Sequence, residues 1–552
     1  MASTTVPTSP VTGSALLLIR FITGWHAMLA LGLGLLAWLI TQGELLQQDV
    51  LRPVAVGLAL IGAVASLIAA PLVLRRDRRG RLLSMGLNYI LAVGCLLMLL
   101  GALGLYTGLD LIAERFYSWA WLLVGLLVGF LIAALGDRYT HVPTTQALFQ
   151  RMGNLIMAAT ILFLLLLMGL PQGLLALLSG LRTPWTLGLL GGTVIFGLAF
   201  WLFWRPTGAR MFAAGERDAE VISGYLFIAP NLIGFLLFFA GPLLFSLWLS
   251  FTDSDSFKAS FIGLRNYVDI FSLQLVSVQS PAQNANELLS RGYLELTRFG
   301  TLVIGARDRI FWIALWNTSV FCFWVTLLSA LPALLVANIL NSKIPGMQIF
   351  RALYFIPSIA GVVGVAVIWK WLYNSNIGFL NYGINQIIGL LNWLPGVELV
   401  PVAIPWLASQ QTALASLILM AAWQLLGFNT ILFLAGLQSI PGEVYEAATI
   451  DGASVWQRFR YMTLPLLAPT SFFVVTTTLI TTLQVFSEPF VMTPTPGGGP
   501  NNATMTAVLY LYQQGFNRFN QGYAAAVAWV LFLFIFAVTL IQFRLQRRYG
   551  EM

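Results

Sequence analysis

The sequence has little charge, few cysteines and few histidines, and each shortage excludes a class of protein. Only 9% of the 552 residues are charged, against about 25% in ordinary soluble domains, which excludes a soluble globular fold. The two cysteines, Cys95 and Cys322, lie within apolar segments, and the two histidines, His26 and His141, stand far apart without companion ligands. These positions argue against a disulfide framework and against a metal site. The phosphate-binding pattern G-x-x-x-x-G-K-[ST] is also missing from the sequence, so this chain is not itself an ATPase.

Long apolar runs make up most of the sequence. Hydrophobic residues account for 58% of the chain, and a helix of about 20 apolar residues crosses the roughly 30 Å hydrocarbon core of a bilayer. The runs predict an all-α polytopic membrane protein with about twelve transmembrane helices. The predicted spans are residues 14–40, 52–74, 82–106, 117–136, 154–170, 184–204, 224–251, 312–340, 349–373, 410–437, 466–491 and 524–545.

The basic residues indicate how these spans are oriented. Much of the net charge of +8 comes from short loops, with five arginines between Arg75 and Arg81 and three more at Arg544, Arg547 and Arg548 after the last span. Short loops rich in Lys and Arg stay in the cytoplasm, so we predict that both termini are cytoplasmic. Because orientation accounts for the basic residues, we predict no nucleic-acid partner.

Polar breaks divide the chain into parts. The stretch 205–223 separates two blocks of about six spans. We therefore predict an N-terminal part, residues 1–215, made of extra transmembrane helices whose role the sequence does not reveal, and a second part, residues 216–552. The second part contains a long external loop at 252–311 and a cytoplasmic loop at 438–466. No paired carboxylates or metal-ligand clusters stand out, so we predict no catalytic and no metal-binding residues.

The loop at 438–466 carries a series of helix signals. Pro441 and Gly442 end the preceding span, and Glu443 favours the start of a new helix because carboxylates stabilise the positive end of a helix. Gly452 interrupts that helix, and Pro465 opens the next span. The loop is thus predicted to form a helix, a bend and a second helix, which together make a projection that another protein could grip.

The same loop contains a recognisable spacing of residues. It reads Glu446-Ala447-Ala448, three residues, Gly452, nine residues, Met462, one residue, Leu464-Pro465. This spacing resembles the EAA signature of the permease subunits of binding-protein-dependent ABC importers, with Met462 where the family usually has Ile. Other segments resemble the sugar-importing branch, of which the maltose permease is the familiar member. These segments read SFTD at 250–253, FIGLRNY at 261–267, FWIALWNT at 311–318 and TPGGGPNNATMTAVLYLYQQGF at 495–516.

This resemblance implies a function and a set of partners. The C-terminal six helices would form a type I ABC importer permease core in the bacterial plasma (inner) membrane, importing a di- or oligosaccharide by alternating access. The partners would be a second homologous permease subunit, a dimeric ATPase that binds ATP and Mg, and an extracytoplasmic solute-binding protein, with no cofactor in this chain. ATPase coupling would fall to Glu446, Ala447, Ala448, Gly452, Leu464 and Pro465. Against the family spacing, residues 273–308 are an insertion whose role stays open.

Polar and aromatic side chains inside the predicted spans are candidates for the solute pathway, because sugars need hydrogen-bonding and aromatic partners. The candidates are Gln424, Asn429, Thr481, Gln484, Ser487, Glu488, Trp371 and Tyr373. Gln484, Ser487 and Glu488 are spaced i, i+3, i+4, so a continuous helix would carry them on one face. Two alternatives stay open: Gln424 and Asn429 also suit helix packing, and Glu488 also suits a solvated rim.

One loop favours a different class of transporter. The stretch Asp77-Arg78-Arg79-Gly80-Arg81 resembles the D-R-x-G-R loop of major-facilitator secondary transporters, although Val73 stands where that family has a glycine. Such transporters have no EAA loop, so the ABC permease is the preferred interpretation. The chain is therefore predicted to be a transport subunit and not an enzyme. The sequence does not reveal the solute or the identity of the partner chains.

Overall fold

The fold is known from a computed structural model. It describes residues 13–42, 52–105, 118–136, 142–168, 179–205, 208, 211–212, 216–255, 258–280, 283–341, 347–394, 398–493 and 497–550. Among the positions discussed above, His141 and the predicted boundary at 215 lie outside these residues. The chain forms two compact units, Met1–Gln47 with Leu51–Ile233, and Gln48–Val50 with Gly234–Met552. The functional division into an N-terminal part and a permease core stays a prediction.

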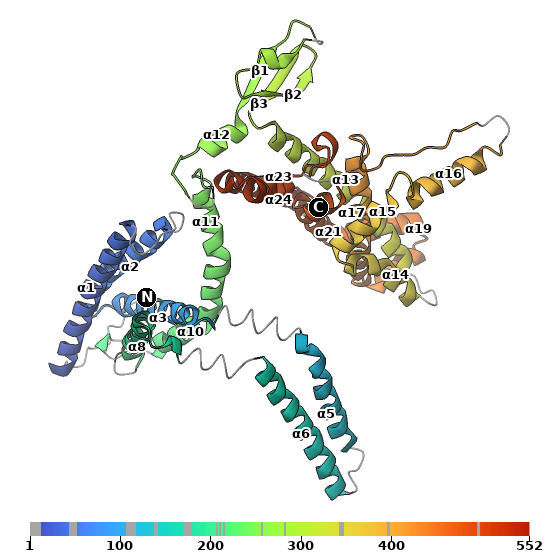
Figure 1. The fold of residues 1–552 in the computed structure, drawn as a ribbon. Helices are drawn as coiled ribbons and strands as arrows, with labels where there is room; N and C mark the ends of the chain where they lie inside the picture. Colours follow the sequence, from blue (N-terminus) through green and yellow to red (C-terminus); the bar gives the residue numbers. More distant parts are fainter. Residues whose placement is uncertain are drawn as a thin grey trace. The chain divides into compact units, whose positions relative to one another are not determined.

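The first unit is made of helices. They are α1 (Gly13–Thr41), α2 (Arg52–Leu74), α3 (Arg78–Ala102), η1 (Ala120–Leu122), α5 (Leu123–Gly136), α6 (Pro143–Leu167), α8 (Pro184–Trp204) and most of α10 (Glu216–Phe235). Polar contacts join α1 to α3: the Trp25 indole donates to Asn88 Oδ1 at 3.2 Å, and His26 Nε2 lies 2.6 Å from Ser84 Oγ. Helices α5 and α6 pack side by side (Figure 1).

The second unit contains the longest helix and a small sheet. Its elements are η3 (Leu236–Ala240), α11 (Gly241–Leu249), α12 (Arg265–Phe271), β1 (Leu273–Ser277), η4 (Ala285–Glu287), β2 (Leu294–Phe299), β3 (Leu302–Ala306), α13 (Arg309–Leu340), α14 (Met347–Ile359), α15 (Val362–Leu372), α16 (Phe379–Leu391), α17 (Ala413–Gln438), α18 (Gly442–Ile450), α19 (Val455–Arg458), η5 (Phe459–Thr463), α20 (Leu464–Leu466), α21 (Ala468–Leu483), α22 (Ser487–Met492), η6 (Pro500–Asn502), α23 (Ala507–Tyr512), η7 (Gln513–Asn517) and α24 (Gln521–Gly550). Its core is the packing of α13, α15, α17 and α21, with Leu417 and Met420 fully buried at the centre.

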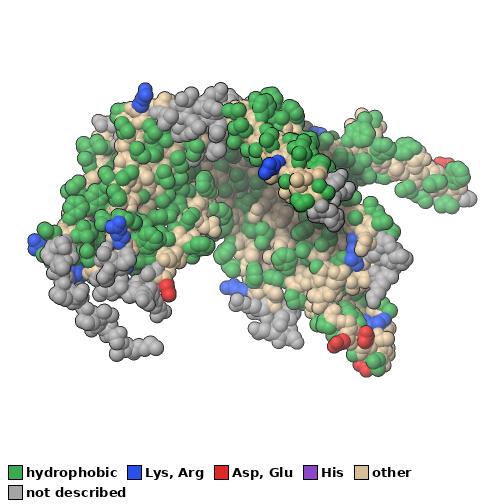
Figure 2. All heavy atoms as spheres, turned by 90° about the horizontal axis from the view of Figure 1, so that it is seen from below, with side chains coloured by type: hydrophobic (Ala, Val, Ile, Leu, Met, Phe, Trp, Pro, Cys, Tyr) green, Lys and Arg blue, Asp and Glu red, His purple; other side chains and the backbone are tan. Residues whose placement is uncertain are grey.

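The helices confirm a polytopic membrane protein. Within the described residues, 9 helices are long and apolar enough to cross a bilayer, and two bent pairs raise that number to 11. One further apolar helix, Leu123–Gly136, is shorter, at 14 residues. Hydrophobic side chains cover most of the surface seen in Figure 2, and charged side chains are scattered and few. An apolar surface of this extent suits contact with lipid.

Four predicted spans differ clearly from the structure. The fourth, predicted as residues 117–136, consists of the short turn η1 and the 14-residue helix α5. The fifth was predicted to begin at 154, but α6 begins at Pro143, because its polar first turns escape a hydropathy window. The ninth, predicted as one helix, is bent by 95° between α14 and α15, where Gly361 takes an extended backbone with ψ 129°. The eleventh, also predicted as one helix, is interrupted between α21 and α22.

The insertion at 273–308 is an exception to the all-helical prediction. It forms a three-stranded antiparallel sheet in the order β1-β3-β2, with Leu275 opposite Ile304 and Arg298 opposite Val303. Gly300, with φ +61°, begins the two-residue turn between β2 and β3. Figure 1 shows the sheet at one end of its unit, next to α12, and its strands β2 and β3 contact α13.

Candidate functional site

The loop predicted to project from the helices, residues 438–466, forms a helix, a bend and a second helix, as expected. The first helix, α18, ends in a tight motif: the Ala453 N–H donates to the Ala448 carbonyl at 2.9 Å, and the Gly452 N–H donates to the Thr449 carbonyl at 3.1 Å. This pair of bonds defines a Schellman motif, whose turning residue must take a positive φ. Gly452 has φ +75°. The bend is therefore built from a residue that reaches this conformation without strain.

The second helix of the loop, α19, is fixed at its start and tied back to α18. Ser454 and Gln457 form a capping box, because the Gln457 N–H donates to Ser454 Oγ at 3.3 Å and the Ser454 N–H donates to Gln457 Oε1 at 2.7 Å. The Arg458 guanidinium donates to Thr449 Oγ1 at 2.8 Å. The two arms of the loop are thus held at a fixed angle.

The loop is anchored to the helices that follow and precede it. The Tyr445 hydroxyl lies 3.0 Å from Thr463 Oγ1, which joins α18 to the π-helical turn η5. Leu464 packs against the core cluster that contains Leu437 of α17 and Leu467. Two prolines, Pro465 and Pro469, lie where the helix bends by 65° into α21. A displacement of the loop is therefore a displacement of these helix ends.

The outward side of the loop is apolar with a carboxylate border. Ile450, Val455, Trp456 and Tyr461 are exposed to between 68% and 86%. Glu443, Glu446 and Asp451 are exposed beside them in the sequence. Of the predicted coupling residues, Ala447 and Pro465 are exposed and Leu464 is half-buried, while Ala448 is buried at 2% exposure. Exposed aromatic and aliphatic side chains on a rigid loop are typical of a protein docking surface.

A small cleft of about 320 Å³ lies between α13, α14, α17 and the interrupted eleventh span. Its walls contain five of the eight predicted solute-pathway residues. These are Gln424, Thr481, Gln484, Ser487 and Glu488. The cleft therefore combines amide, hydroxyl and carboxyl groups with apolar walls that include Phe321 and Phe428. Such a mixture suits the hydroxyls and the apolar faces of a sugar.

The reason given for grouping Gln484, Ser487 and Glu488 was wrong, although the three do come together. They do not share a helical face, because α21 ends at Leu483 and α22 begins at Ser487. The break follows from Pro489, which has no N–H and whose ring clashes with the carbonyl four residues earlier, that of Val485. Thr506 Oγ1 donates to that carbonyl at 3.0 Å. Because of the break, side chains of α21 and of α22 line the same cleft.

Gln424 both lines the cleft and makes a contact that holds two helices of its wall together. Its side-chain amide donates to the Ala360 carbonyl at 3.2 Å, at the bend between α14 and α15. One turn along α17, Gly427 lies against the backbone of α14, where an added Cβ would come within 2.1 Å of the Tyr354 carbonyl oxygen. Both contacts hold α14 against α17, so the packing role that the sequence left open for Gln424 is present together with its place in the cleft.

The other three predicted pathway residues do not line the cleft. Asn429 donates to Ser329 Oγ at 3.1 Å and accepts from Thr478 Oγ1 at 3.3 Å, which joins α17 to α13 and α21. Tyr373 is buried and donates to the Ser416 carbonyl at 2.8 Å. Trp371 is 57% exposed. In this conformation Asn429 and Tyr373 make helix-packing contacts.

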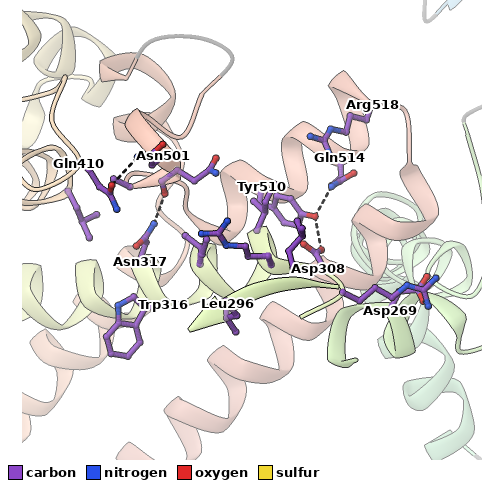
Figure 3. A pocket seen from close by; sticks show the side chains of 18 of the residues that line it. Asp269, Leu296, Asp308, Trp316, Asn317, Gln410, Asn501, Tyr510, Gln514 and Arg518 are labelled. Atoms are coloured by element: carbon purple, nitrogen blue, oxygen red, sulfur yellow. Dashed lines mark hydrogen bonds and ion pairs between the residues drawn. The ribbon is translucent and has the colours of Figure 1, made fainter. Parts of the chain in front are cut away.

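A larger pocket, of about 1170 Å³, was not predicted from the sequence (Figure 3). It lies at the start of α13 and is also lined by the segments around Gln410 and Asn501 and by the end of α23. Asp308 is central to its construction. Its carboxylate accepts from the Phe311 N–H at 3.0 Å, as the N-cap of α13, and from the Tyr510 hydroxyl at 2.6 Å. The Tyr523 hydroxyl is a third donor to the same carboxylate.

The pocket wall is held by further polar contacts that Figure 3 marks. Gln514 Nε2 donates to the Tyr510 hydroxyl at 2.7 Å, and Asn501 Nδ2 donates to Gln410 Oε1 at 3.0 Å. Burial, with the Asp308 carboxylate beside it, raises the pKa of Tyr510 well above its usual range, so the phenol stays a donor. The sequence signal for this site was Asp308 directly before a helix, an N-cap position.

Comparison with known proteins gives the family. Residues 311–551 match the family described as binding-protein-dependent transport system inner membrane component. The chain is 34% identical over 325 residues to the probable ABC transporter permease protein YesP of Bacillus subtilis, with 58% of this chain and 90% of that protein covered. It is 32% identical over 345 residues to the arabinooligosaccharides transport system permease protein AraP of the same organism, with 62% and 94% covered.

A third relative comes from a different organism. The chain is 30% identical over 333 residues to the trehalose/maltose transport system permease protein MalF of Thermococcus litoralis, with 60% of this chain and 95% of that protein covered. These matches include nearly the whole of each relative, and none of them favours the secondary-transporter alternative. The chain belongs to the family of binding-protein-dependent transport system inner membrane components.

Proposed function

We propose that this chain is the permease subunit of an ATP-driven importer of an oligosaccharide, coupled through residues 438–466 to a separate ATPase. The observation that carries the proposal is the construction of that loop. Its two short helices are fixed to each other by a capping box, a Schellman motif and the Arg458–Thr449 bond. It presents exposed apolar side chains, and only short connections join it to α17 and α21.

The loop has the properties that mechanical coupling requires. A partner that grips Trp456 and Ile450 would desolvate apolar surface, which favours association by about 25 cal/mol per Å² buried. Glu446, on the exposed side of α18, would pair with a cation or a backbone donor of the ATPase. Because the loop is stiff, its movement would be delivered to α21 and not absorbed by local bending.

The small cleft is the proposed solute site of the permease. Thr481 and Gln484 at the end of α21, and Ser487 and Glu488 at the start of α22, offer donors and acceptors to sugar hydroxyls. The names of two relatives refer to arabinooligosaccharides and to trehalose and maltose, which supports an oligosaccharide as the solute. Alternating access would then follow from movement of α21, since one of its ends joins the loop and the other lines the cleft.

The partners in this proposal are those that the family resemblance implies. They are a second homologous permease subunit, a dimeric ATPase that holds ATP and Mg, and an extracytoplasmic solute-binding protein. Both termini and the loop at 438–466 would lie in the cytoplasm, and the sheet β1–β3 would lie outside. The basic residues around Arg75–Arg81 support this orientation.

The experiment is to co-express the chain with the subunits encoded beside it and to measure whether an ATPase co-purifies. In the test variant, residues 443–462 are replaced by a Gly-Ser linker of equal length. In the control, residues 283–292, a mostly exposed part of the connection between β1 and β2 in which Ala285 and Leu289 are buried, are replaced in the same way. Loss of the ATPase from the test variant alone would support the proposal. Equal recovery of the ATPase with both variants would contradict it, as would solute transport by the chain alone on an ion gradient.

A further inference from the structure

The lining of the large pocket carries more positive than negative charge. Its wall contains three arginines and two aspartates, and both carboxylates are already engaged, Asp269 by Arg307 at 2.6 Å and Asp308 by its tyrosines. Among the described residues, no hydrogen bond or ion pair engages the guanidinium of Arg309 or Arg518, and both residues are exposed. The pocket therefore offers two cations to whatever enters it.

The charge of Arg309 is placed where it does not stabilise the helix that carries it. It is the first residue of α13, where the positive end of the helix dipole disfavours a cation. A carboxylate does lie nearby on β2, that of Glu295, but Arg298 binds it at 2.8 Å. Glu295 interacts with Arg309 only as a nearby charge, without an ion pair. A cation placed against the helix dipole and without an ion pair of its own is poised for an anionic ligand.

The rest of the wall suits a carbohydrate. Trp316 lies in it with 70% of its surface exposed, and an exposed indole is a flat platform on which a sugar ring can stack. Amide side chains line the wall as well, including Gln411 and Asn520, and amides both donate to and accept from hydroxyls. At about 1170 Å³, the pocket exceeds the range of roughly 300–1,000 Å³ that holds drug-sized ligands, so several sugar rings fit.

The large pocket precedes the small cleft along α13 and along α17. Asn317 of α13 lines the pocket, and Phe321, four residues later on the same helical face, lines the cleft. On α17 the order repeats, with Leu414 in the pocket and Ala421 in the cleft. Four residues of helix span about 6 Å. This continuity favours a solute on its way to the cleft over an acidic side chain of a docked protein.

We propose that the large pocket binds an acidic oligosaccharide, with a uronate carboxylate on Arg309 and Arg518 and a sugar ring against Trp316. The proposal rests on the function proposed above and narrows its solute class to sugars that carry carboxylates. The exposed cations would give the first contact, and the amides would then order the chain of rings above the cleft.

The test uses the full chain in lipid nanodiscs and two probes of equal length, trigalacturonate and maltotriose, titrated by saturation-transfer NMR. The charge variant is Arg309→Gln with Arg518→Gln. Its matched control is Arg265→Gln with Arg291→Gln, which removes two exposed external cations that do not line the pocket. Trigalacturonate should bind, and its affinity should fall at least about tenfold in the charge variant. The control should bind as the native chain does.

Two further readings separate a sugar site from simple ion binding. Trp316→Ala, at an exposed position, should weaken the binding of trigalacturonate although both arginines are intact. Added salt should weaken the binding of trigalacturonate more than that of maltotriose. Equal binding of the two probes, an unaffected charge variant or an unaffected Trp316→Ala variant would overturn the proposal. So would capture of an acidic protein segment that trigalacturonate does not displace.

The failure of this proposal is distinguishable from failure of the proposed function. If an ATPase is recovered with the charge variant but trigalacturonate does not bind the native chain, the acidic-sugar site is refuted and the importer proposal is not. Trigalacturonate binding without any ATPase recovered would leave the pocket as a binding site and remove the importer on which the assignment of a transported solute rests.

Discussion

The sharpest prediction concerns substitution of Gly452, the residue at the bend of the projecting loop. Its φ of +75° lies in the left-handed region, and a Cβ added there would meet no atom within 4 Å. Substitution by Ala is therefore penalised by backbone conformation alone and not by a clash. Gly442, at the start of α18, also has open space around it but an ordinary φ. The pair Gly452→Ala and Gly442→Ala thus isolates the conformational effect.

The magnitude follows from the cost of the left-handed conformation. A non-glycine residue there loses about 1–2 kcal/mol, which corresponds to roughly 5–30-fold in the equilibrium between the closed and the open helix end. Asn tolerates this region better than Ala does, so Gly452→Asn should lose less. The hydrogen bond from the Ala453 N–H to the Ala448 carbonyl reports the closed form.

The assay is hydrogen exchange, measured by mass spectrometry on residues 442–458 of the full chain in nanodiscs. Gly452→Ala should exchange faster by the stated factor, Gly452→Asn by less, and Gly442→Ala by little. In the assembled transporter, solute uptake should fall in the same order, while membrane insertion stays normal. Exchange of Gly452→Ala at the native rate, or an equal effect of Gly442→Ala, would refute the reasoning.

Three further predictions concern the cleft and the sheet. Thr506→Val removes the donor to the Val485 carbonyl, a buried group, and should lower the free energy of unfolding by about 1–3 kcal/mol, measured by thermal unfolding in detergent. Gln484→Ala removes one partner of the sugar hydroxyls and should raise the KM for uptake about fivefold, since a typical hydrogen bond contributes about 1 kcal/mol. The hydrogen bond from Arg298 lowers the pKa of Glu295, so Arg298→Gln should return that pKa toward its ordinary value in an NMR titration. A lowered carboxyl pKa stabilises the sheet above the ordinary pKa, and this contribution is lost as the pH falls through the lowered value.

Each of these predictions has a control in the same chain. Thr477→Val makes the same change where the hydroxyl only returns to its own helix, to the Phe473 carbonyl, and should be nearly neutral. Gln521→Ala lies outside the cleft and should leave KM unchanged. Equal destabilisation by the two Thr variants would contradict the first prediction. An unchanged KM for Gln484→Ala would contradict the second. An Arg298→Gln protein that kept the pKa of Glu295 low would contradict the third.

Local signals allowed much of the projecting loop to be predicted from sequence. Pro441, Gly452 and Pro465 each act through their own backbone preferences, so their positions fixed the helix, the bend and the exit. The capping box at Ser454 and Gln457 was missed, although the S-x-x-Q spacing was visible in the sequence.

The breaks within the spans and the sheet were missed for physical reasons. A hydropathy window averages over a proline, so Pro489 did not register, although it lies in α22, six residues after the end of α21 at Leu483. The alternating pattern of β1 and the Gly300-Thr301 turn are strand and hairpin signals, but they were read only as an insertion.

The large pocket could not have been predicted from spacing. It brings Asp308, Gln410 and Arg518 together from segments separated by about a hundred residues each, and only the packing of α13, α17 and α24 sets those distances. The small cleft was found more easily, because four of its predicted residues lie within eight positions of one another, at Thr481–Glu488.

Helix α21 is jointed at both ends. At one end the chain turns by 65° at the prolines that follow the loop, and at the other it stops at Gln484 before α22. Its 16 residues make a rod about 24 Å long that is bent against the preceding helix at one end and interrupted at the other. We expect such a rod to tilt as a unit. A small tilt forced at Pro465 would move Thr481 and Gln484 across the cleft, while Val485, just before α22, stays bonded to Thr506.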